Sequence, residues 1–182
     1  GSEGTLGVIV EVTLRLARPP ADALVALCAV PDDDAVLALF ARLRASDLTL
    51  SAFECLDEGC VRHVLAHRGG AAPFAEPSAR LVLIEVEVPL PGASAREHSE
   101  AALGDVLGAA SEADEIDDAL LAATPAQARG LWALREDISE SLHRHTPHKA
   151  DIALPVARVG EFLAAWRPAV AAGLPGIEAL CF

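Results

Sequence analysis

The chain has 182 residues, 52% of them hydrophobic and 23% charged, which is the composition of a globular protein with a substantial core. Its formal net charge of −13 argues against a nucleic-acid partner, because phosphate binding requires clustered lysine and arginine. No apolar run reaches the roughly 18 residues that a membrane span requires.

Residues 1–16 join a glycine-rich turn to a strand pattern. Apolar and polar side chains alternate over residues 8–16, which predicts a half-buried strand. The pair Pro19-Pro20 ends this strand and indicates a linker into a new unit. The chain begins without methionine and contains none, so we expect it to be a piece of a longer protein.

The middle of the chain alternates between strand and helix patterns. The predicted strands are residues 24–30, 48–56, 80–89 and, more weakly, 113–116. The predicted helices are one capped by Asp32, Asp33 or Asp34 with apolar positions to Leu43, one from 57 to 67, and one from 94 to 110. A Gly/Pro/Ala loop separates the second helix from the third strand.

The strongest predicted helix opens at Thr124 and Pro125. Thr124 suits the N-cap and Pro125 the first helical position, and the helix is expected to run to about His145, before Pro147. A strand over 149–154, a helix over 155–171 and a strand over 177–182 follow. This order predicts an α+β fold: an antiparallel sheet with helices on one face, built from two ferredoxin-like halves.

The cysteines and histidines do not indicate a metal site. The four cysteines, Cys28, Cys55, Cys60 and Cys181, form no Cys-x-x-Cys pair, and we expect reduced, mostly buried thiols in a cytoplasmic protein. Three histidines, His143, His145 and His148, gather at the end of the long predicted helix, where positive charge suits the helix dipole. The pair His63 and His67 lacks a third ligand nearby in sequence.

One arginine falls on the apolar stripe of the long predicted helix. At about 100° per residue, Arg135 lies among the leucines of that stripe, and a buried guanidinium must be paired. One interpretation is a structural ion pair with an internal acid such as Asp151. The other is a clamp for a substrate carboxylate, which the planar fork of arginine suits.

Two further polar side chains are expected near Arg135. Ser139 follows it by one helical turn, and Lys149, the single lysine of the chain, begins the next predicted strand. An arginine, a hydroxyl and a lysine that converge from a helix and a strand would form a carboxylate site. A solvated lysine without such a role is the alternative.

Taken together, these segments resemble the FAD-linked oxidases of the vanillyl-alcohol oxidase type. The resemblance is to the branch that contains D-lactate, glycolate and D-2-hydroxyglutarate dehydrogenases, and it covers essentially the whole chain. The segments that carry it are Gly-Ser-Glu-Gly-Thr-Leu-Gly-Val-Ile at 1–9, Ser-Ala-Phe-Glu-Cys-Leu-Asp at 51–57, Leu-Trp-Ala-Leu-Arg-Glu at 131–136 and Lys-Ala-Asp-Ile-Ala-Leu-Pro at 149–155.

The resemblance implies a division of the chain and a set of site residues. Residues 1–18 would be the tail of an FAD-binding domain, and 19–182 a substrate-binding cap domain truncated at its C-terminal end. The residues implied to contact the substrate carboxylate are Arg135, Ser139 and Lys149, and those implied to lie along FAD are Glu3, Gly4, Gly7, Val8 and Ile9.

The resemblance also implies a reaction that this chain alone does not perform. A 2-hydroxy acid would be oxidised by hydride transfer to the flavin, while the Gly-His-x-Gly-Asp-Gly-Asn-x-His motif that supplies the catalytic histidine lies outside residues 1–182. We therefore expect no catalytic residue, no metal ligand and no bound FAD in this piece. Its partners would be the 2-hydroxy acid, the missing FAD domain and, through an exposed sheet edge, a second copy in a homodimer.

Two other functions are compatible with these residues. One is a non-catalytic anion-binding or interaction module, because the ferredoxin-like fold hosts many unrelated functions. The other is a non-oxidative flavoenzyme of the same superfamily.

Overall fold

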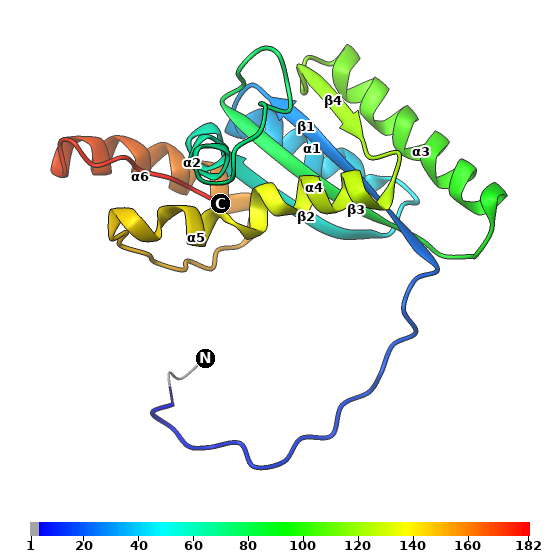
Figure 1. Ribbon diagram of the computed structural model, residues 1–182, viewed down its shortest axis with the longest axis horizontal. Helices are drawn as coiled ribbons and strands as arrows, with labels where there is room; N and C mark the ends of the chain where they lie inside the picture. The colour runs from blue at the N-terminus through cyan, green and yellow to red at the C-terminus, as the bar shows by residue number, and fades with distance from the viewer. Residues whose placement is uncertain (1–3) are drawn as a thin grey trace.

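The computed structural model describes residues 4–182 (Figure 1). The strands are β1 (Asp22–Val30), β2 (Leu50–Asp57), β3 (Arg80–Val88) and β4 (Asp118–Leu121). The helices are α1 (Asp33–Ala45), α2 (Glu58–Arg68), α3 (Ala93–Glu112), α4 (Pro125–Glu136), α5 (Ile138–Leu142) and α6 (Val159–Gly173). Two short 3-10 turns lie at His143–His145 and Val156–Arg158.

The four strands form one antiparallel sheet in the order β2-β3-β1-β4. Without α2, the order of elements from β1 to β4 is the β-α-β-β-α-β arrangement of a ferredoxin-like unit. The predicted α+β class and antiparallel sheet are thus confirmed. A second ferredoxin-like half was also predicted, but the described residues after β4 contain helices and coil without a further strand.

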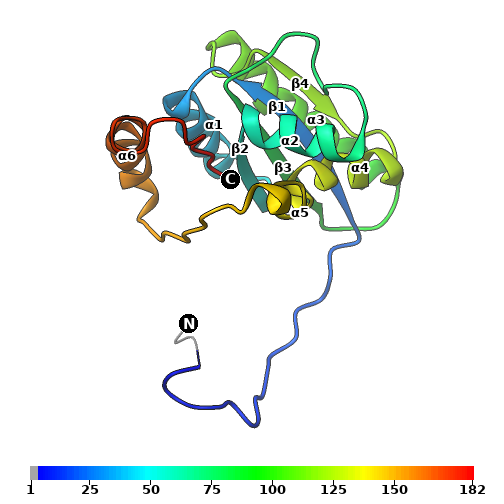
Figure 2. The same ribbon diagram turned by 60° about the vertical axis from the view of Figure 1, so that its left-hand side comes forward.

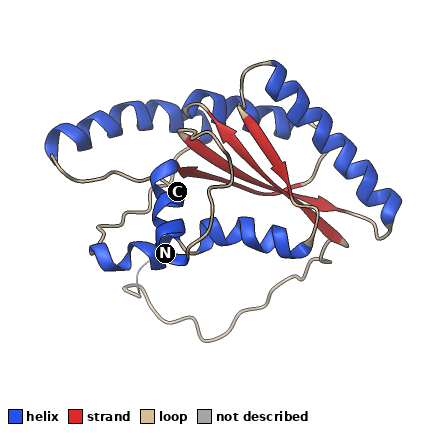
Figure 3. Ribbon diagram, turned by 45° about the horizontal axis from the view of Figure 1, so that its top comes forward, coloured by secondary structure: helices blue, strands red, loops and turns tan. Residues whose placement is uncertain are grey.

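Helices cover both faces of the sheet, where the sequence analysis predicted one covered face (Figure 3). The reason lies in β1, whose residues from Leu24 to Val30 are a continuous apolar run and are all buried. The even-numbered side chains of this run pack with α1 and α3 in a first core. The odd-numbered ones pack with α2, α4 and α5 in a second core.

The N-terminal residues do not form the predicted strand. Residues 8–16 have no regular structure, and Val8, Val10 and Leu16 are each at least 88% exposed. The segment runs away from the folded body (Figure 2). An alternating pattern predicts a strand only where a partner strand exists, and none within the described residues pairs with this segment.

Two other predicted strand positions are wrong in detail. Residues 113–116 form the turn after α3, where Asp114 takes a left-handed conformation at φ 56°. The fourth strand follows it at Asp118–Leu121 and pairs with β1. Residues 149–154 are exposed coil, and no strand within residues 4–182 pairs with them.

The end of the chain is held without being a strand. Residues 177–182 were predicted as a strand, but they have no ladder; instead, Asp57 N–H donates to the Cys181 carbonyl at 3.0 Å. The Cys181 N–H donates in return to Asp57 Oδ2 at 2.8 Å. The C-terminal segment therefore lies beside the junction of β2 and α2.

The long predicted helix is divided in two. Thr124 Oγ1 accepts from Gln127 N–H at 3.2 Å, which confirms the predicted cap of α4. The helix was predicted to continue to His145, but Asp137 lies between α4 and α5 with ψ near 3°, outside the α-helical range. An ion pair of 2.8 Å ties Asp137 to Arg68 of α2. The break therefore turns α5 along α2.

All four cysteines are free thiols, with Cys28 and Cys60 buried and Cys55 and Cys181 partly buried. Burial, with a smaller contribution from the Asp118 carboxylate, raises the pKa of Cys28 to about 12. Among the described helices, none combines the length and apolar character that crossing a bilayer needs.

Candidate substrate-binding site

The rotation of α4 is fixed by apolar side chains. Leu134 and, after the break, Ile138 are buried in the second core, where they pack against the sheet. Arg135 follows Leu134 directly, so it leaves the helix at the rim of this core, toward the edge strand β2. Its side chain is 31% exposed, and it is thus neither fully buried nor freely solvated.

Arg135 makes one ion pair and one ring contact. Its Nε donates to Glu54 Oε2 at 2.8 Å, and its Cζ lies 5.3 Å from the centre of the Phe182 ring. An acid of this chain pairs with Arg135, as the interpretation of a structural ion pair requires. The suggested partner, Asp151, is wrong, because it lies in the exposed coil after α5, whereas Glu54 lies on β2.

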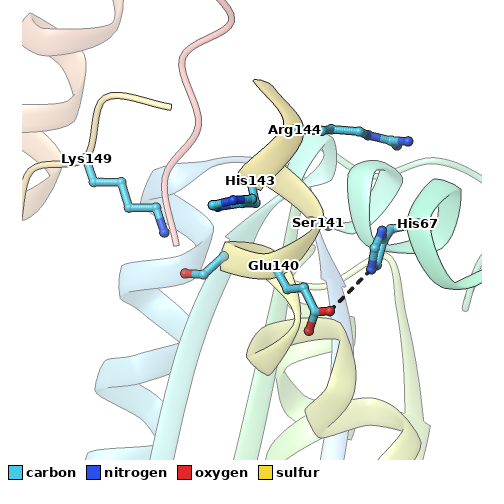
Figure 4. A pocket seen from close by; sticks show the side chains of 7 residues that line it. His67, Glu140, Ser141, His143, Arg144 and Lys149 are labelled. Atoms are coloured by element: carbon cyan, nitrogen blue, oxygen red, sulfur yellow. Dashed lines mark ion pairs between the residues drawn. The ribbon is translucent and has the colours of Figure 1, made fainter. Parts of the chain in front are cut away.

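Ser139 and Lys149 line one open hollow of about 550 Å³, but Arg135 is not among the residues around it. Figure 4 shows Lys149 and His143 pointing toward the same space. The structure thus brings two of the three expected substrate-contacting residues together. Arg135 lies one turn before Ser139, at the junction of α4 and α5.

The hollow contains two permanent cations, Lys149 and Arg144. Its lining is completed by His67, Glu140, Ser141, His143 and Arg144. The one carboxylate, Glu140, lies 3.7 Å from His67 Nε2. Among the described residues, no carboxylate forms an ion pair with Lys149 or Arg144, in contrast to arginines such as Arg42, which is paired with Glu115. An anion that enters the hollow would therefore meet unpaired positive charge.

A charged network that the sequence analysis missed lies at the other side of β2. Arg167 of α6 forms two hydrogen bonds of 2.9 Å with Asp57, and Arg80 Nε donates to Asp33 Oδ1 at 2.5 Å. Burial alone would raise the pKa of Asp33, but Arg80 and Arg167 outweigh it and hold that pKa below its ordinary value. The network attaches α6 to α1 and β2. No sequence signal links these four residues, since each comes from a different element.

The residues expected along FAD do not form a flavin site by themselves. Glu3 lies outside the described residues, while Val8 and Ile9 are at least 86% exposed. A Cβ placed on Gly4 or Gly7 would meet nothing within 4 Å, so neither glycine has a close neighbour in this structure. Within residues 4–182, no cluster of His, Cys, Asp and Glu could hold a metal ion.

Similar proteins are 2-hydroxy-acid dehydrogenases. The chain is 38% identical over 182 residues to a D-2-hydroxyglutarate dehydrogenase of Xanthomonas citri pv. viticola, which covers all of this chain and 37% of that protein. For a D-2-hydroxyglutarate dehydrogenase of Stutzerimonas stutzeri the identity is 32%, covering all of this chain and 38% of that protein. A mitochondrial D-lactate dehydrogenase [cytochrome] of Arabidopsis thaliana is 29% identical over 169 residues, which are 90% of this chain and 28% of that protein.

The chain thus spans less than two-fifths of the length of these relatives. Glu54, which sequence reasoning did not single out as a site residue, lies in the segment 51–57 that carries part of the family resemblance. Residues 19–177, which include the whole sheet, Glu54, Arg135 and the hollow, match the family of FAD linked oxidases, C-terminal domain. The chain belongs to this family.

Proposed function

We propose that this chain is the substrate-binding part of an FAD-dependent oxidoreductase that oxidises a D-2-hydroxy acid of the lactate, glycolate or 2-hydroxyglutarate type. The names of the relatives support the substrate class. Residues 1–18 would belong to the FAD-binding domain and 19–182 to the cap domain, a boundary supported by the family match from residue 19.

The observation that carries the proposal is the hydrogen bonding of the Arg135 guanidinium. Only its Nε is engaged, by Glu54, and among the described residues nothing accepts a hydrogen bond from its two terminal nitrogens. These two nitrogens form the end of the guanidinium fork, which matches the two oxygens of a carboxylate. Arg135 can therefore hold a substrate carboxylate while it keeps its ion pair.

Ser139 and Lys149 would extend this carboxylate site. Both line the cationic hollow next to the junction of α4 and α5, and Ser139 lies one turn after Arg135. A hydroxyl and an ammonium offer hydrogen bonds to a further oxygen of the substrate. When these contacts hold the carboxylate, they fix the position of the neighbouring carbon, which bears the hydroxyl group.

FAD, bound by the rest of the whole protein, would accept the hydride from that carbon. The described part of the chain would contribute binding and orientation, and a base from outside it would accept the hydroxyl proton. We propose a cytoplasmic location, supported by the four free thiols. A homodimer is a further proposal, supported by β2 and β4 as edge strands of the sheet.

The test is an anaerobic titration of the whole protein with a panel of D-2-hydroxy acids, followed by the visible spectrum of the flavin. We expect one acid to bleach the flavin band. Arg135→Met should raise the apparent Kd of that acid, taken from the dependence of the bleaching rate on acid concentration, about 10- to 100-fold, because a hydrogen-bonded charge pair is lost. Arg129→Met, an exposed arginine of the same helix, is the matched control and should behave as the wild type.

Each other outcome would overturn part of the proposal. Equal effects of Arg135→Met and Arg129→Met would show that Arg135 does not bind the substrate. A flavin band that no hydroxy acid bleaches would exclude the substrate class. A whole protein that binds no flavin, even after reconstitution with FAD, would favour an anion-binding module that uses the cationic hollow.

A further inference from the structure

We infer that Glu54 is a positioning residue for substrate oxidation: through its bond to Nε it orients Arg135 so that the two terminal nitrogens face the substrate carboxylate. This inference rests on the proposed function of Arg135. It adds a residue that the proposed carboxylate site did not include.

Glu54 is placed to act on Arg135 by the sheet. It lies on the edge strand β2, where its register partner is Leu83 of β3, a residue of the second core. Its side chain therefore emerges on the same face as α4, at the rim of the core. Because β2 is paired with β3 without interruption from Ala52 to Asp57, the backbone that carries this carboxylate is held by the sheet.

The ion pair between Arg135 and Glu54 consists of one hydrogen bond, which involves only the Nε of the guanidinium. Arg135 Nε and Glu54 Oε2 are 2.8 Å apart, and the two side chains are 31% and 32% exposed. A pair exposed to this extent contributes little to stability. Its main consequence is geometric, since a bond to Nε fixes the rotation of the guanidinium and leaves the end of the fork available.

Phe182 restricts the same guanidinium from a second direction. Its ring centre is 5.3 Å from Arg135 Cζ, so the ring contacts the group while Glu54 holds its Nε. Two contacts from distant parts of the chain thus restrict the position of the fork. Preorganisation of this kind avoids the entropic cost of ordering an arginine when the substrate binds.

Glu85 provides a contrast on the same face of the sheet. It accepts hydrogen bonds from Trp132 Nε1 at 2.9 Å and from Ser51 Oγ at 2.9 Å, and it forms no ion pair with an arginine of the described chain. Glu85 therefore attaches α4 to β3 through the neutral side chain of Trp132. A variant of Glu85 removes a carboxylate from the same surface without releasing Arg135.

The experiment measures the rate of flavin reduction by saturating hydroxy acid in the whole protein, together with the apparent Kd. Glu54→Leu should lower the rate about 10-fold, because a misplaced carboxylate misplaces the reacting carbon. Glu54→Gln keeps an acceptor for Nε and should stay within about threefold of the wild type. Glu85→Leu should lower the melting temperature but leave the reduction rate unchanged.

The variants separate the inference from its alternatives. If Glu54 acted only through its negative charge, Glu54→Gln and Glu54→Leu would tighten substrate binding equally and leave the reduction rate unchanged. If it were only structural, Glu54→Leu would lower the melting temperature without changing the rate. Either result would overturn the inference. If Arg135→Met leaves substrate binding intact, the proposed function itself fails.

A second variant keeps the inference testable if Glu54→Leu does not fold. Phe182→Leu removes the ring contact with Arg135 and leaves the ion pair, so it should lower the reduction rate about threefold, in the same direction as Glu54→Leu. If Glu54→Leu does not fold, a folded Phe182→Leu that reduces the flavin at the wild-type rate would contradict the inference.

Discussion

The two faces of the sheet differ in what their rims contain. The face covered by α1 and α3 has an apolar core with fully buried residues such as Leu39 and Leu103, and the ion pairs at its rim, such as Arg42 with Glu115, join elements of the fold to one another. The face covered by α2, α4 and α5 has an apolar centre of similar size, but carboxylates line its rim on β2 and β3. The comparison teaches that one face serves stability alone, whereas the other also holds an arginine at a defined position.

The largest expected effect tests the apolar face. Leu39→Ala should lower the free energy of unfolding of the chain by about 2–5 kcal/mol, because Leu39 is fully buried and its removal leaves a cavity. Leu134→Ala, at the rim of the other core and 8% exposed, should cost less, since the helix can relax toward solvent. Urea unfolding followed by tryptophan fluorescence measures both values. A larger loss of unfolding free energy for Leu134→Ala would show that the face covered by α4 contributes more to stability at these positions.

Much of this architecture could be predicted from the sequence, because it depends on local patterns. The strands around Leu24–Val30 and Arg80–Val88 and the caps of α1 and α4 follow from apolar runs and capping residues that need no distant partner. The prediction of one covered face failed because it followed from the order of the elements, which does not show whether a strand is apolar on one side or on both. The run in β1 is apolar at every position and needs cover on both sides.

The candidate site could be predicted only in part. The position of Arg135 on an apolar stripe showed that it needs an acid, but the acid is Glu54, 81 residues earlier in the chain. Which acid it is depends on the register between β2 and β3, and the sequence of α4 carries no information about that register. Likewise, the alternating pattern of residues 8–16 predicts a strand but does not identify a partner strand, and the segment is exposed.

A second prediction concerns the charged network that attaches α6 to α1 and β2. The pKa of Asp33 is held below its ordinary value, so the unfolded chain takes up a proton at this group first as the pH falls. The stabilisation from Asp33 is therefore complete above the ordinary pKa of about 3.9 and is lost as the pH falls toward the lower pKa of the folded state. Asp33→Asn cannot titrate and should be less stable than the wild type at pH 6.

The difference in the free energy of unfolding between wild type and Asp33→Asn should narrow from pH 6 to pH 3. Urea unfolding at both pH values measures it, and Asp32, the cap of α1, is present in both proteins. A difference that stays constant would mean that Asp33 titrates alike in the folded and unfolded chain. In that case the charge of Asp33 would not contribute to the attachment of α6 to α1.

The smallest expected effect compares the caps of one helix from each face. Asp32 Oδ1 accepts from Ala35 N–H at 2.8 Å in α1, and Thr124 Oγ1 accepts from Gln127 N–H at 3.2 Å in α4. Replacement of either residue by alanine should cost about 1 kcal/mol of stability, slightly more for Asp32, whose charge also suits the helix N-terminus. Thermal unfolding of the chain measures both losses.

The two cap variants also allow the faces to be compared by substrate affinity, measured in the whole protein. Asp32→Ala should leave the affinity unchanged, because α1 covers the face that serves stability alone. Thr124→Ala should change it less than about twofold, since the burial of Leu134 and Ile138 holds the far end of α4 when its first turn frays. A large loss of affinity in Thr124→Ala would show that Arg135 depends on the whole length of α4. Its position would then not be set by Glu54 and the rim of the second core.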